Sequence, residues 1–573
     1  MKKLLNDVSQ TVPDMLEGLV ASSQGLRLCD GTTTVVRDDT DALAAEGTVA
    51  LISGGGAGHE PAHAGYVGAG LLTAAVSGDV FASPSADAVL DAIREVRSDA
   101  GVLLLVKNYT GDVLNFGLAA QIARSEGTPV DMVVIGDDVA LLDHHGDDAR
   151  RGLAGTVLIH KIAGAAAAAG KPLAEVAQIA RDAAAGLWTM GVGLGACTVP
   201  ASGKPNFELG ADEIEWGLGI HGEPGVRKSS LASADSIVGD LLDHLCEHGQ
   251  LGDSSRVALL VNNLGGTTRM ELDVVAGSTL RALAERGVQT ERVWVGNYLT
   301  ALEMPGVSLS LLSVTDELLE LLDAEASSPA WRAGATPRPH REHAGIPAND
   351  DVATDAPVER SGDDAESVTA QLVRAACAAL IAAEEELTDM DRLVGDGDLG
   401  TSLERGSRAV LAQLDSNPAA SPADLLAAAS AALRRAIGGT SGPLYSSLVL
   451  GASVVLRDAD TAEGATIAEA FSQGVASVTE LGGATVGDCT MMDALIPAQE
   501  RFAAQIAAGA DPVTALAAAV TAAEEGAAST EDMVAAKGRS RYVADRAIGT
   551  PDPGAHAVAL WLGAVHRSAV GAS

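Results

Sequence analysis

Three aspartates lie close together in residues 390–400, which read MDRLVGDGDLG. Asp391, Asp396 and Asp398 fall within eight residues, and the glycines between them allow the backbone to bend sharply. Converging carboxylates repel one another unless a cation lies among them, and hard oxygen ligands suit Mg²⁺ or Ca²⁺ better than Zn²⁺. An acidic surface turn would also fit this stretch alone, so the other motifs must decide.

Four loops farther along the chain combine glycine with hydroxyl or charged residues. Backbone N–H groups and hydroxyls at the start of a helix can hold phosphate oxygens, and Arg539 could add a charge-assisted contact. Any one of these loops could simply cap a helix, but together with the aspartates they indicate a Mg–nucleotide site. It is not a P-loop site, because no G-x-x-x-x-G-K-[ST] sequence occurs. The loops are residues 438–443 (GGTSGP), 482–491 (GGATVGDCTM), 537–539 (KGR) and 552–554 (DPG).

A second group of polar residues follows two apolar runs in the N-terminal half. His59 comes after a run of glycines, and Lys107 and Asp112 flank the next such loop. A histidine, a lysine and an aspartate on adjacent strand-end loops suit acid–base chemistry on a small hydroxylated molecule. A structural loop with an ordinary surface histidine fits the same residues. The pattern H-E-x-x-H at 59–63 does not predict zinc, because Pro61 would break the helix that this motif requires.

A third candidate is His221, in the loop 217–225 (GLGIHGEPG). Glycine and proline bound this loop, so His221 lies neither on an apolar helix face nor in a run of charges. A histidine that is held rigidly in this way can act as a nucleophile. A histidine bonded to the backbone fits the loop equally well.

The elements that position these residues change along the chain. From about residue 45 to 325, continuous apolar runs alternate with helical patterns such as 85–96 and 116–125, which predicts an α/β architecture with largely parallel sheets. Ligands of such folds collect beyond the carboxyl ends of the strands, where His59, Lys107 and Asp112 lie. The predicted strands are 49–53, 102–107, 132–136, 256–262 and 292–296, with weaker candidates at Val36 and at 309–314.

The pattern changes at residue 327. Residues 327–364 are rich in Pro, Asp, Arg and Ala without apolar periodicity, which predicts a flexible linker. The remainder predicts a bundle of about six to nine helices without strands. The predicted domains are therefore 1–326, a linker at 327–364 and a helical domain at 365–573. The helical segments are 367–387, 422–436, 466–481, 512–523 and 555–565.

The composition excludes some classes of partner. The formal net charge is −39, from 38 Lys and Arg against 77 Asp and Glu, which argues against nucleic acid and anionic membranes. A bound Mg²⁺ or a ring of backbone N–H groups can still attract an anionic small ligand. The five cysteines lack any metal-binding spacing, and neither a secretory signal nor a membrane-spanning window is present. We expect a soluble cytoplasmic protein.

Several long motifs resemble the dihydroxyacetone kinase family in its single-chain, ATP-dependent form. The resemblance covers nearly the whole chain and joins an α/β ketose-binding part to an all-α antiparallel helical barrel for the nucleotide. The N-terminal motifs are GGGAGHEPAHAGYVG, GDVFASPS, KNYTGDVLNF, GLAGTVLIHKIAGA and GLGIHGEPG. The C-terminal motifs are DRLVGDGDLG, GGTSGPLYSSL, GDCTMMDAL and KGRSRY followed by IGTPDPGA.

The resemblance implies roles for the N-terminal residues. His221 would bind the substrate carbonyl covalently as a hemiaminal, which selects ketoses and aldoses over glycerol. Asp112 would be the base for the attacking hydroxyl, and His59 would hydrogen-bond the substrate and assist proton transfer. The pocket would be lined by Gly56, Ala57, Gly58 and Lys107.

The resemblance also implies that Asp391, Asp396 and Asp398 hold two Mg²⁺ ions that bridge the phosphates. Fusion of both parts in one chain favours ATP as the phosphoryl donor, and family members are often homodimers. The nucleotide would be lined by Leu399, Gly400, Thr401, Ser402, Thr440, Ser441, Gly482, Met491, Arg539, Asp552, Pro553 and Gly554.

The sequence leaves several alternatives open. The ketose could be dihydroxyacetone, glyceraldehyde or D- or L-erythrulose, because no residue reveals the chain length that the pocket accepts. Two functions remain as alternatives to an ATP-dependent kinase. One is a phosphocarrier-dependent fusion with ADP as a bound cofactor, and the other is a non-catalytic sugar-sensing regulator. Some relatives also cyclise FAD at the nucleotide site.

Overall fold

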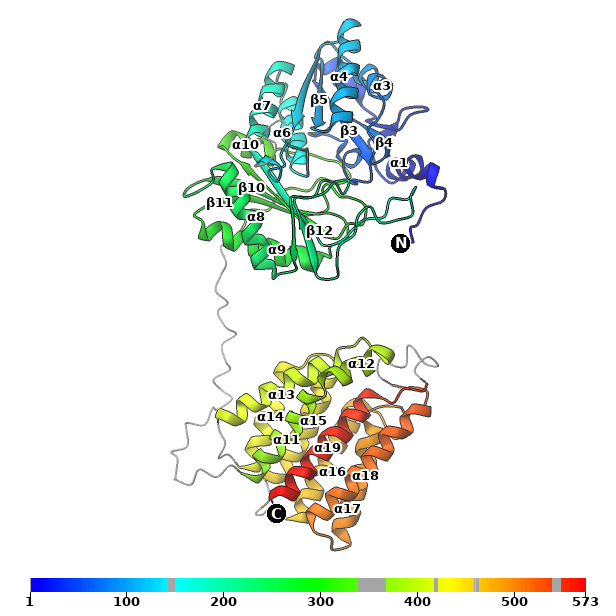
Figure 1. Cartoon of the computed structure of the whole chain (residues 1–573), viewed down its shortest axis with the longest axis vertical. Helices are drawn as coiled ribbons and strands as arrows, with labels where there is room; N and C mark the ends of the chain where they lie inside the picture. The colour runs from blue at the N-terminus through cyan, green and yellow to red at the C-terminus, as the bar shows by residue number, and fades with distance from the viewer. Residues whose placement is uncertain are drawn as a thin grey trace. The chain divides into compact units, whose positions relative to one another are not determined.

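The computed structural model describes residues 2–142, 150–338, 367–416, 421–457, 459, 463–537 and 548–572. The chain divides into two compact units, Met1–Ala348 and Asn349–Ser573 (Figure 1). Within the described ranges, no helix is long and apolar enough to cross a bilayer.

The first sheet of the N-terminal unit explains why its apolar runs are continuous. In space, the strands lie in the order β1 (Leu26–Leu28), β2 (Thr34–Arg37), β4 (Ala74–Val80), β3 (Ala50–Ala57), β5 (Val102–Lys107) and β6 (Val130–Ile135). The last four are parallel, whereas β1 and β2 pair antiparallel at one edge. Leu103 and Leu105 of β5 enter one core while Leu104 and Val106 enter another, so both faces of the strand are buried.

Helices cover both faces of this sheet (Figure 1). The cores place α3 and α4 on one face and α6 and α7 on the other, as expected for parallel strands joined by helical crossovers. The helices are η1 (Val8–Gln10), α1 (Thr11–Ala21), α2 (Thr40–Glu46), η2 (Ala64–Tyr66), α3 (Ala86–Val96), α4 (Thr110–Ser125), α6 (Thr156–Ala168) and α7 (Leu173–Ala185).

The second sheet differs from the prediction of largely parallel sheets. Its order is β11 (Gln289–Gly296), β10 (Arg256–Asn263), β12 (Gly306–Ser313), β7 (Leu187–Gly193), β8 (Glu213–Trp216) and β9 (Arg227–Ser230). Only β10 and β11 are parallel, because β12 returns between β10 and β7 in the opposite direction. The prediction was therefore wrong for this sheet, which α8 (Ala234–Gly249), α9 (Arg269–Glu285) and α10 (Asp316–Asp323) accompany.

The two sheets share a hydrophobic core. Residues of α6, which is buried over 156–167, pack in one cluster with β3 and β5 of the first sheet and with Leu260 and Leu312 of the second. Loops from both sheets are therefore held in one rigid body, which is a condition for a site assembled from distant parts of the sequence.

Residues 327–338 do not begin a linker. Ser327 N–H donates to Ala69 O at 2.9 Å, and Ala335 exchanges backbone hydrogen bonds with Val293 at 2.9 and 3.0 Å. Trp331 is buried against Trp294, with ring centroids 5.7 Å apart. The predicted start of the linker was therefore too early, since two tryptophans anchor this apparently aperiodic segment. Residues 339–364 of the predicted linker lie outside the described residues.

The C-terminal unit contains nine α-helices and no strand within its described residues. Eight of them form a closed ring by contact between neighbours, in the order α11, α13, α14, α15, α16, α17, α18, α19 and back to α11 (Figure 1). The bounds are α11 (Val368–Ala382), α12 (Glu384–Val394), α13 (Leu399–Ser416), α14 (Pro422–Ala436), α15 (Ser441–Arg457), α16 (Gly464–Gly482), α17 (Met492–Ala507), α18 (Pro512–Ser529), η4 (Thr530–Asp532) and α19 (Pro553–Ala572).

The ring confirms the predicted helical barrel and brings the loops with candidate residues together. Consecutive helices in such a ring run in opposite directions, so alternate connections lie at the same end. The connections that precede α13, α15, α17 and α19 therefore share one end of the barrel, and these four helices all begin there.

Replacing Trp331 by alanine tests the docking of residues 327–338. Loss of this buried ring should lower the free energy of unfolding by about 3 kcal/mol, measured by urea unfolding followed by circular dichroism. Arg332→Ala is the matched control, because its side chain is exposed and only its carbonyl oxygen accepts the Trp294 indole N–H. Equal stability of the two variants would contradict the docking.

Candidate functional site

His59 lies directly after β3 and is fully buried. Its Nδ1 lies 2.7 Å from the carbonyl oxygen of Thr300, which can only accept, so Nδ1 carries the proton. Its buried Nε2 has no hydrogen-bond partner among the described residues. Burial, with the nearby His221 and Lys107, lowers the pKa of His59 well below its usual value. His59 therefore presents a neutral acceptor nitrogen.

His221 lies between β8 and β9, with its ring centroid 4.9 Å from that of His59. Glu223 holds it twice: one carboxylate oxygen is 2.6 Å from Nδ1, and the other accepts the backbone N–H of His221 at 3.0 Å. Burial alone would raise the pKa of Glu223, but the contacts with His221 outweigh it and lower that pKa to about 2. The Glu223 carboxylate thus accepts a hydrogen bond from Nδ1–H, which keeps the proton on Nδ1 and leaves the lone pair of Nε2 available.

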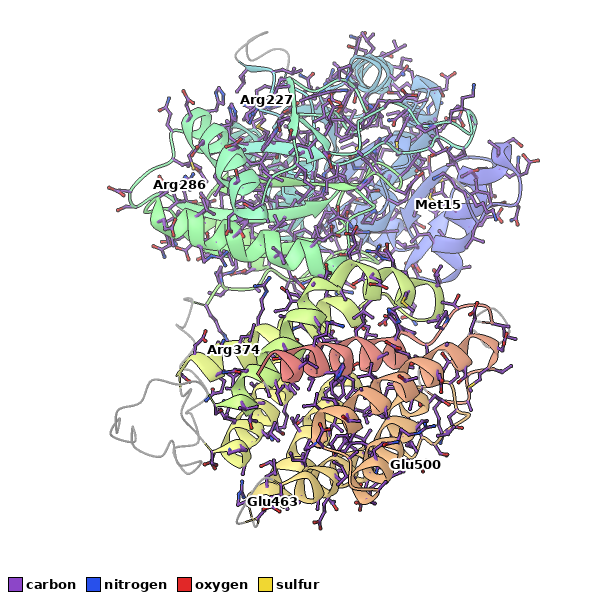
Figure 2. All side chains as sticks on the ribbon, turned by 60° about the horizontal axis from the view of Figure 1, so that its bottom comes forward. Met15, Arg227, Arg286, Arg374, Glu463 and Glu500 are labelled. Carbon is purple, nitrogen blue, oxygen red and sulfur yellow. The ribbon has the colours of Figure 1, made fainter. Side chains whose placement is uncertain are left out.

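The strands that flank this loop form a short antiparallel hairpin. Arg227, labelled in Figure 2, extends from β9 and lies 4.3 Å from the ring centroid of Trp216 on β8. The indole N–H of Trp216 also donates to Ser229 Oγ at 2.9 Å. These cation–π and hydrogen-bond contacts hold together the two strands that flank the loop with His221.

Asp112 and Lys107 are both buried, and Lys107 lies close enough to His59 for its charge to act on that imidazole. Asp112, in the first turn of α4, accepts a short hydrogen bond from Ser83 through one oxygen, and its other oxygen lies 3.6 Å from Lys107 Nζ. Burial lowers the pKa of Lys107, and the charge of Asp112 opposes that effect. Glycine suits position 55, because its φ of +153° is one that L side chains rarely adopt and a Cβ would also crowd Lys107 Nζ.

Two aromatic side chains complete the wall around the histidines. Phe81 stacks on His59 at 5.1 Å between centroids and meets His221 at 5.2 Å, and Tyr109 meets the edge of His221 at 4.9 Å. A Cβ at Gly58 would lie 2.8 Å from the Phe81 ring, so only glycine fits between them. Gly56 and Ala57, also predicted to line the pocket, are the last residues of β3.

The structure brings together every residue predicted for the N-terminal site, but sequence reasoning assigned no role to several others. Phe81, Ser83, Tyr109 and Glu223 lie inside motifs that were noted only as whole motifs. No local signal identified Thr300, which is 241 residues from its partner His59. Residues 59–63 form a turn rather than a helix, in agreement with the rejection of a zinc-protease motif.

At one end of the helical barrel, Asp391, Asp396 and Asp398 each place a carboxylate oxygen within 4.8 Å of the other two. Asp391 comes from α12, and one of its oxygens accepts the N–H groups of Asp398 and Leu399 at 2.9 and 3.3 Å. These bonds fold the loop back so that the carboxylates converge. An all-oxygen set of this kind fits Mg²⁺.

The predicted nucleotide residues lie at the same end, and most of them stand at helix starts. N-termini of α13, α15, α17 and α19 carry unpaired N–H groups and the positive ends of the helix dipoles, which attract phosphate oxygens. Leu399, Gly400, Thr401 and Ser402 open α13, Thr440 and Ser441 open α15, Gly482 ends α16, Met491 precedes α17, and Asp552, Pro553 and Gly554 open α19. Arg539 lies outside the described residues.

Two aspartates support these loops, the buried Asp493 and the partly buried Asp552. Asp493, which sequence reasoning missed, accepts the N–H groups of Gly487 at 2.6 Å and Thr490 at 2.7 Å. Asp552 caps α19 by accepting the Ala555 N–H at 2.8 Å. Burial raises the pKa of Asp552 to about 7, and Asp493 and Asp391 push it in the same direction. Negative charge is therefore concentrated at this end, as expected where cations bind.

Comparisons with known proteins agree with both sites. The Dak1 domain model matches residues 17–330 and the DAK2 domain model matches residues 393–567. The chain belongs to the dihydroxyacetone kinase family. It is 45% identical over 576 residues to the triokinase/FMN cyclase of Homo sapiens, covering 98% of each chain. It is 37% identical to the L-erythrulose 1-kinase of Mycolicibacterium smegmatis, covering 99% of each.

A solved structure of the family has the same architecture. The dihydroxyacetone kinase from C. freundii in complex with AMP-PNP and Mg²⁺ is 35% identical, with a TM-score of 0.62 and 99% of each chain covered. The α/β part followed by a helical barrel is thus the fold of the family. ATP and Mg²⁺ are its cofactors, in agreement with the aspartate cluster and the helix starts described above.

Replacing Asp396 by alanine tests the metal site. Loss of one carboxylate should weaken binding of Mg²⁺–AMP-PNP about 100-fold in calorimetry, as is typical when support for a metal site is removed. Asp389→Ala is the matched control, because that exposed aspartate of α12 pairs with Arg392. Affinity unchanged by D396A would overturn the metal assignment.

Proposed function

We propose that this phosphotransferase transfers the γ-phosphoryl group of ATP to a terminal hydroxyl of a short-chain ketose whose carbonyl is bound covalently to His221. One observation carries this proposal: the Nδ1 of His221 is bonded to Glu223, and its Nε2 is available in a ring that lies beside His59. A kinase that only bound a polyol would not need a nucleophilic imidazole. Dihydroxyacetone, glyceraldehyde and the erythruloses all offer the carbonyl that this nitrogen requires.

Capture begins with attack of the His221 Nε2 lone pair on the carbonyl carbon. The π pair of the C=O bond moves to the oxygen, which takes up a proton from water, and a hemiaminal forms. The imidazole keeps its Nδ1 proton and becomes positive, while the low pKa of Glu223 keeps a negative carboxylate 2.6 Å away. Glu223 thus stabilises the adduct by charge and holds the ring in the reactive tautomer.

The held substrate then presents its terminal hydroxyl to Asp112. Ser83 occupies one oxygen of Asp112, so the other is available to take the hydroxyl proton as the oxygen attacks the γ-phosphorus. The neutral His59 Nε2 accepts a hydrogen bond from a substrate hydroxyl and orients it. Asp391, Asp396 and Asp398 would hold Mg²⁺, which would neutralise charge on the phosphates, and the helix N-termini would position the phosphate oxygens.

Two alternatives to this function can be distinguished from it, one by the site residues and the other by the phosphoryl donor. A non-catalytic regulator would not need both the His221–Glu223 pair and the three converging aspartates. A phosphocarrier-dependent enzyme would use the same ketose chemistry but would not consume free ATP. We also expect a homodimer, as the family resemblance implies.

An ADP-release assay with Mg–ATP tests the proposed function directly. We expect turnover on at least one of dihydroxyacetone, glyceraldehyde, D-erythrulose and L-erythrulose, and none on glycerol, which has no carbonyl for His221. A single preferred sugar would also identify the substrate. If ATP binds but none of the four sugars causes ADP release, a carrier-dependent or regulatory protein would be favoured. Turnover of glycerol would contradict covalent capture.

Replacing His221 by alanine tests the covalent step. With dihydroxyacetone labelled at its carbonyl carbon, ¹³C NMR of the wild-type complex should show a signal of a tetrahedral carbon that H221A lacks. Turnover should fall by several orders of magnitude, because positioning by a covalent bond contributes a large effective concentration. His244→Ala on α8 is the control and should keep the signal. A tetrahedral signal that persists in H221A would exclude the assignment.

A further inference from the structure

We propose that His63, to which no role has been given above, is a positioning residue that holds the charged Lys107 ammonium in the ketose site. The inference rests on the proposed function, because it concerns the same site. It starts from an observation the mechanism does not use: a buried line of hydrogen bonds runs from Lys107 through His63 to His160 on α6.

The contacts of Lys107 show why it needs such support. Only 1% of its side chain is exposed, so water cannot satisfy its three ammonium protons. Its Nζ lies 2.9 Å from His63 Nε2, 3.3 Å from the Gly54 carbonyl oxygen and 3.6 Å from Asp112. The shortest contact of this buried cation is therefore with a histidine rather than with the carboxylate.

The direction of these hydrogen bonds follows from Lys107. An ammonium can only donate, so His63 Nε2 must accept and His63 must carry its proton on Nδ1. That Nδ1 lies 3.0 Å from His160 Nε2 and 3.4 Å from Ser53 Oγ, so either atom can accept a hydrogen bond from it. His160 must then carry its own proton on Nδ1, which is buried and has no partner among the described residues.

Both imidazoles are suited to this task because they stay neutral. Burial is the main cause that lowers the pKa of His63 well below its usual value and that of His160 to about 3, and the charge of Lys107 adds to it. The titratable groups that face Lys107 are Asp112 from α4, His59 and His63 from the segment after β3, and His160 from α6. Only Asp112 among them is an acidic group that can pair with the ammonium.

This arrangement limits the approach of Lys107 to Asp112, whose nearest oxygen lies 3.6 Å from Nζ. With His63 as acceptor, the ammonium stays by Gly54 and Gly55, and the Asp112 oxygen that Ser83 does not occupy remains available for a substrate hydroxyl. Without that acceptor, the ammonium loses its proton at lower pH. Loss of this charge beside Asp112 reduces turnover, whereas covalent capture at His221 does not depend on it.

The test compares His63→Leu, which removes the acceptor, with His63→Gln, whose side-chain oxygen can replace Nε2. Both kcat and KM for dihydroxyacetone are measured against pH in the ADP-release assay. A lysine must be protonated to remain charged, so a lowered pKa of Lys107 moves the alkaline limb of the kcat profile to lower pH. For H63L we expect a shift of about one to two pH units, the worth of a hydrogen bond to a charged group, and a kcat about tenfold lower at neutral pH. H63Q should recover most of both.

Two results would overturn the inference. The first is an alkaline limb of the kcat profile that does not move in H63L. The second is an equal loss of kcat in H63L and H63Q, as expected of a residue needed only for packing. If H63L does not fold, as judged by circular dichroism, His160→Leu must shift the limb in the same direction by a smaller amount, because Ser53 still accepts from His63. An unshifted limb there would also contradict the inference.

The control separates this inference from the proposed function. Wild-type enzyme must turn over the ketose, and Asp112→Asn must abolish turnover without preventing the ¹³C signal of capture. Failure of either result would count against the proposed function itself. Active wild type with an unchanged H63L would count against the role of His63 alone.

Discussion

An imidazole offers a free lone pair at a defined nitrogen only when its other nitrogen is committed to an acceptor. Both histidines of the ketose site meet this condition, His59 through the Thr300 carbonyl and His221 through Glu223. The acceptor for His59 comes from the loop between β11 and β12 of the second sheet, whereas His59 follows β3 of the first. The chemistry therefore depends on the core that α6 shares with both sheets, because a small displacement between them would release the Nδ1 proton and change the tautomer.

The helical barrel solves a different electrostatic problem. A chain with a net charge of −39 must bind a polyanionic nucleotide. Its ring of alternating helices directs the N-termini of α13, α15, α17 and α19 to one end, next to three converging carboxylates. Helix dipoles and unpaired N–H groups attract phosphate, and bound cations reverse the sign of the carboxylates. A basic surface is therefore unnecessary.

The strongest sequence predictions concerned strands and helices with long, regular patterns. Residues 102–107 and 422–436 correspond to β5 and α14 as predicted, since buried parallel strands and amphipathic helices have distinct periods. The weak candidate at 309–314 proved to be β12, a nearly fully buried strand in the middle of the second sheet. Its serines and glycine weaken the apolar pattern in the sequence. The strand can nevertheless be buried, because Ser308 and Ser310 have hydrogen-bond partners on neighbouring strands. The prediction that a linker begins at residue 327 was wrong for a similar reason. Two tryptophans 37 positions apart hold residues 327–338 in place, and such a pair does not form a local pattern.

The sequence by itself determined which residue types could do chemistry and that they belong to two parts, one for a carbonyl sugar and one for a Mg–nucleotide. Glycine-rich loops and clustered aspartates are local features, so their meaning could be read from neighbouring residues. Only the tertiary structure decided the protonation pattern. The proton positions on His59, His63 and His221 depend on Thr300, Lys107 and Glu223, and two of these three partners lie far away in sequence. A hydrogen bond across such a distance exists only after the core has formed, and for that reason it leaves no periodicity in the sequence.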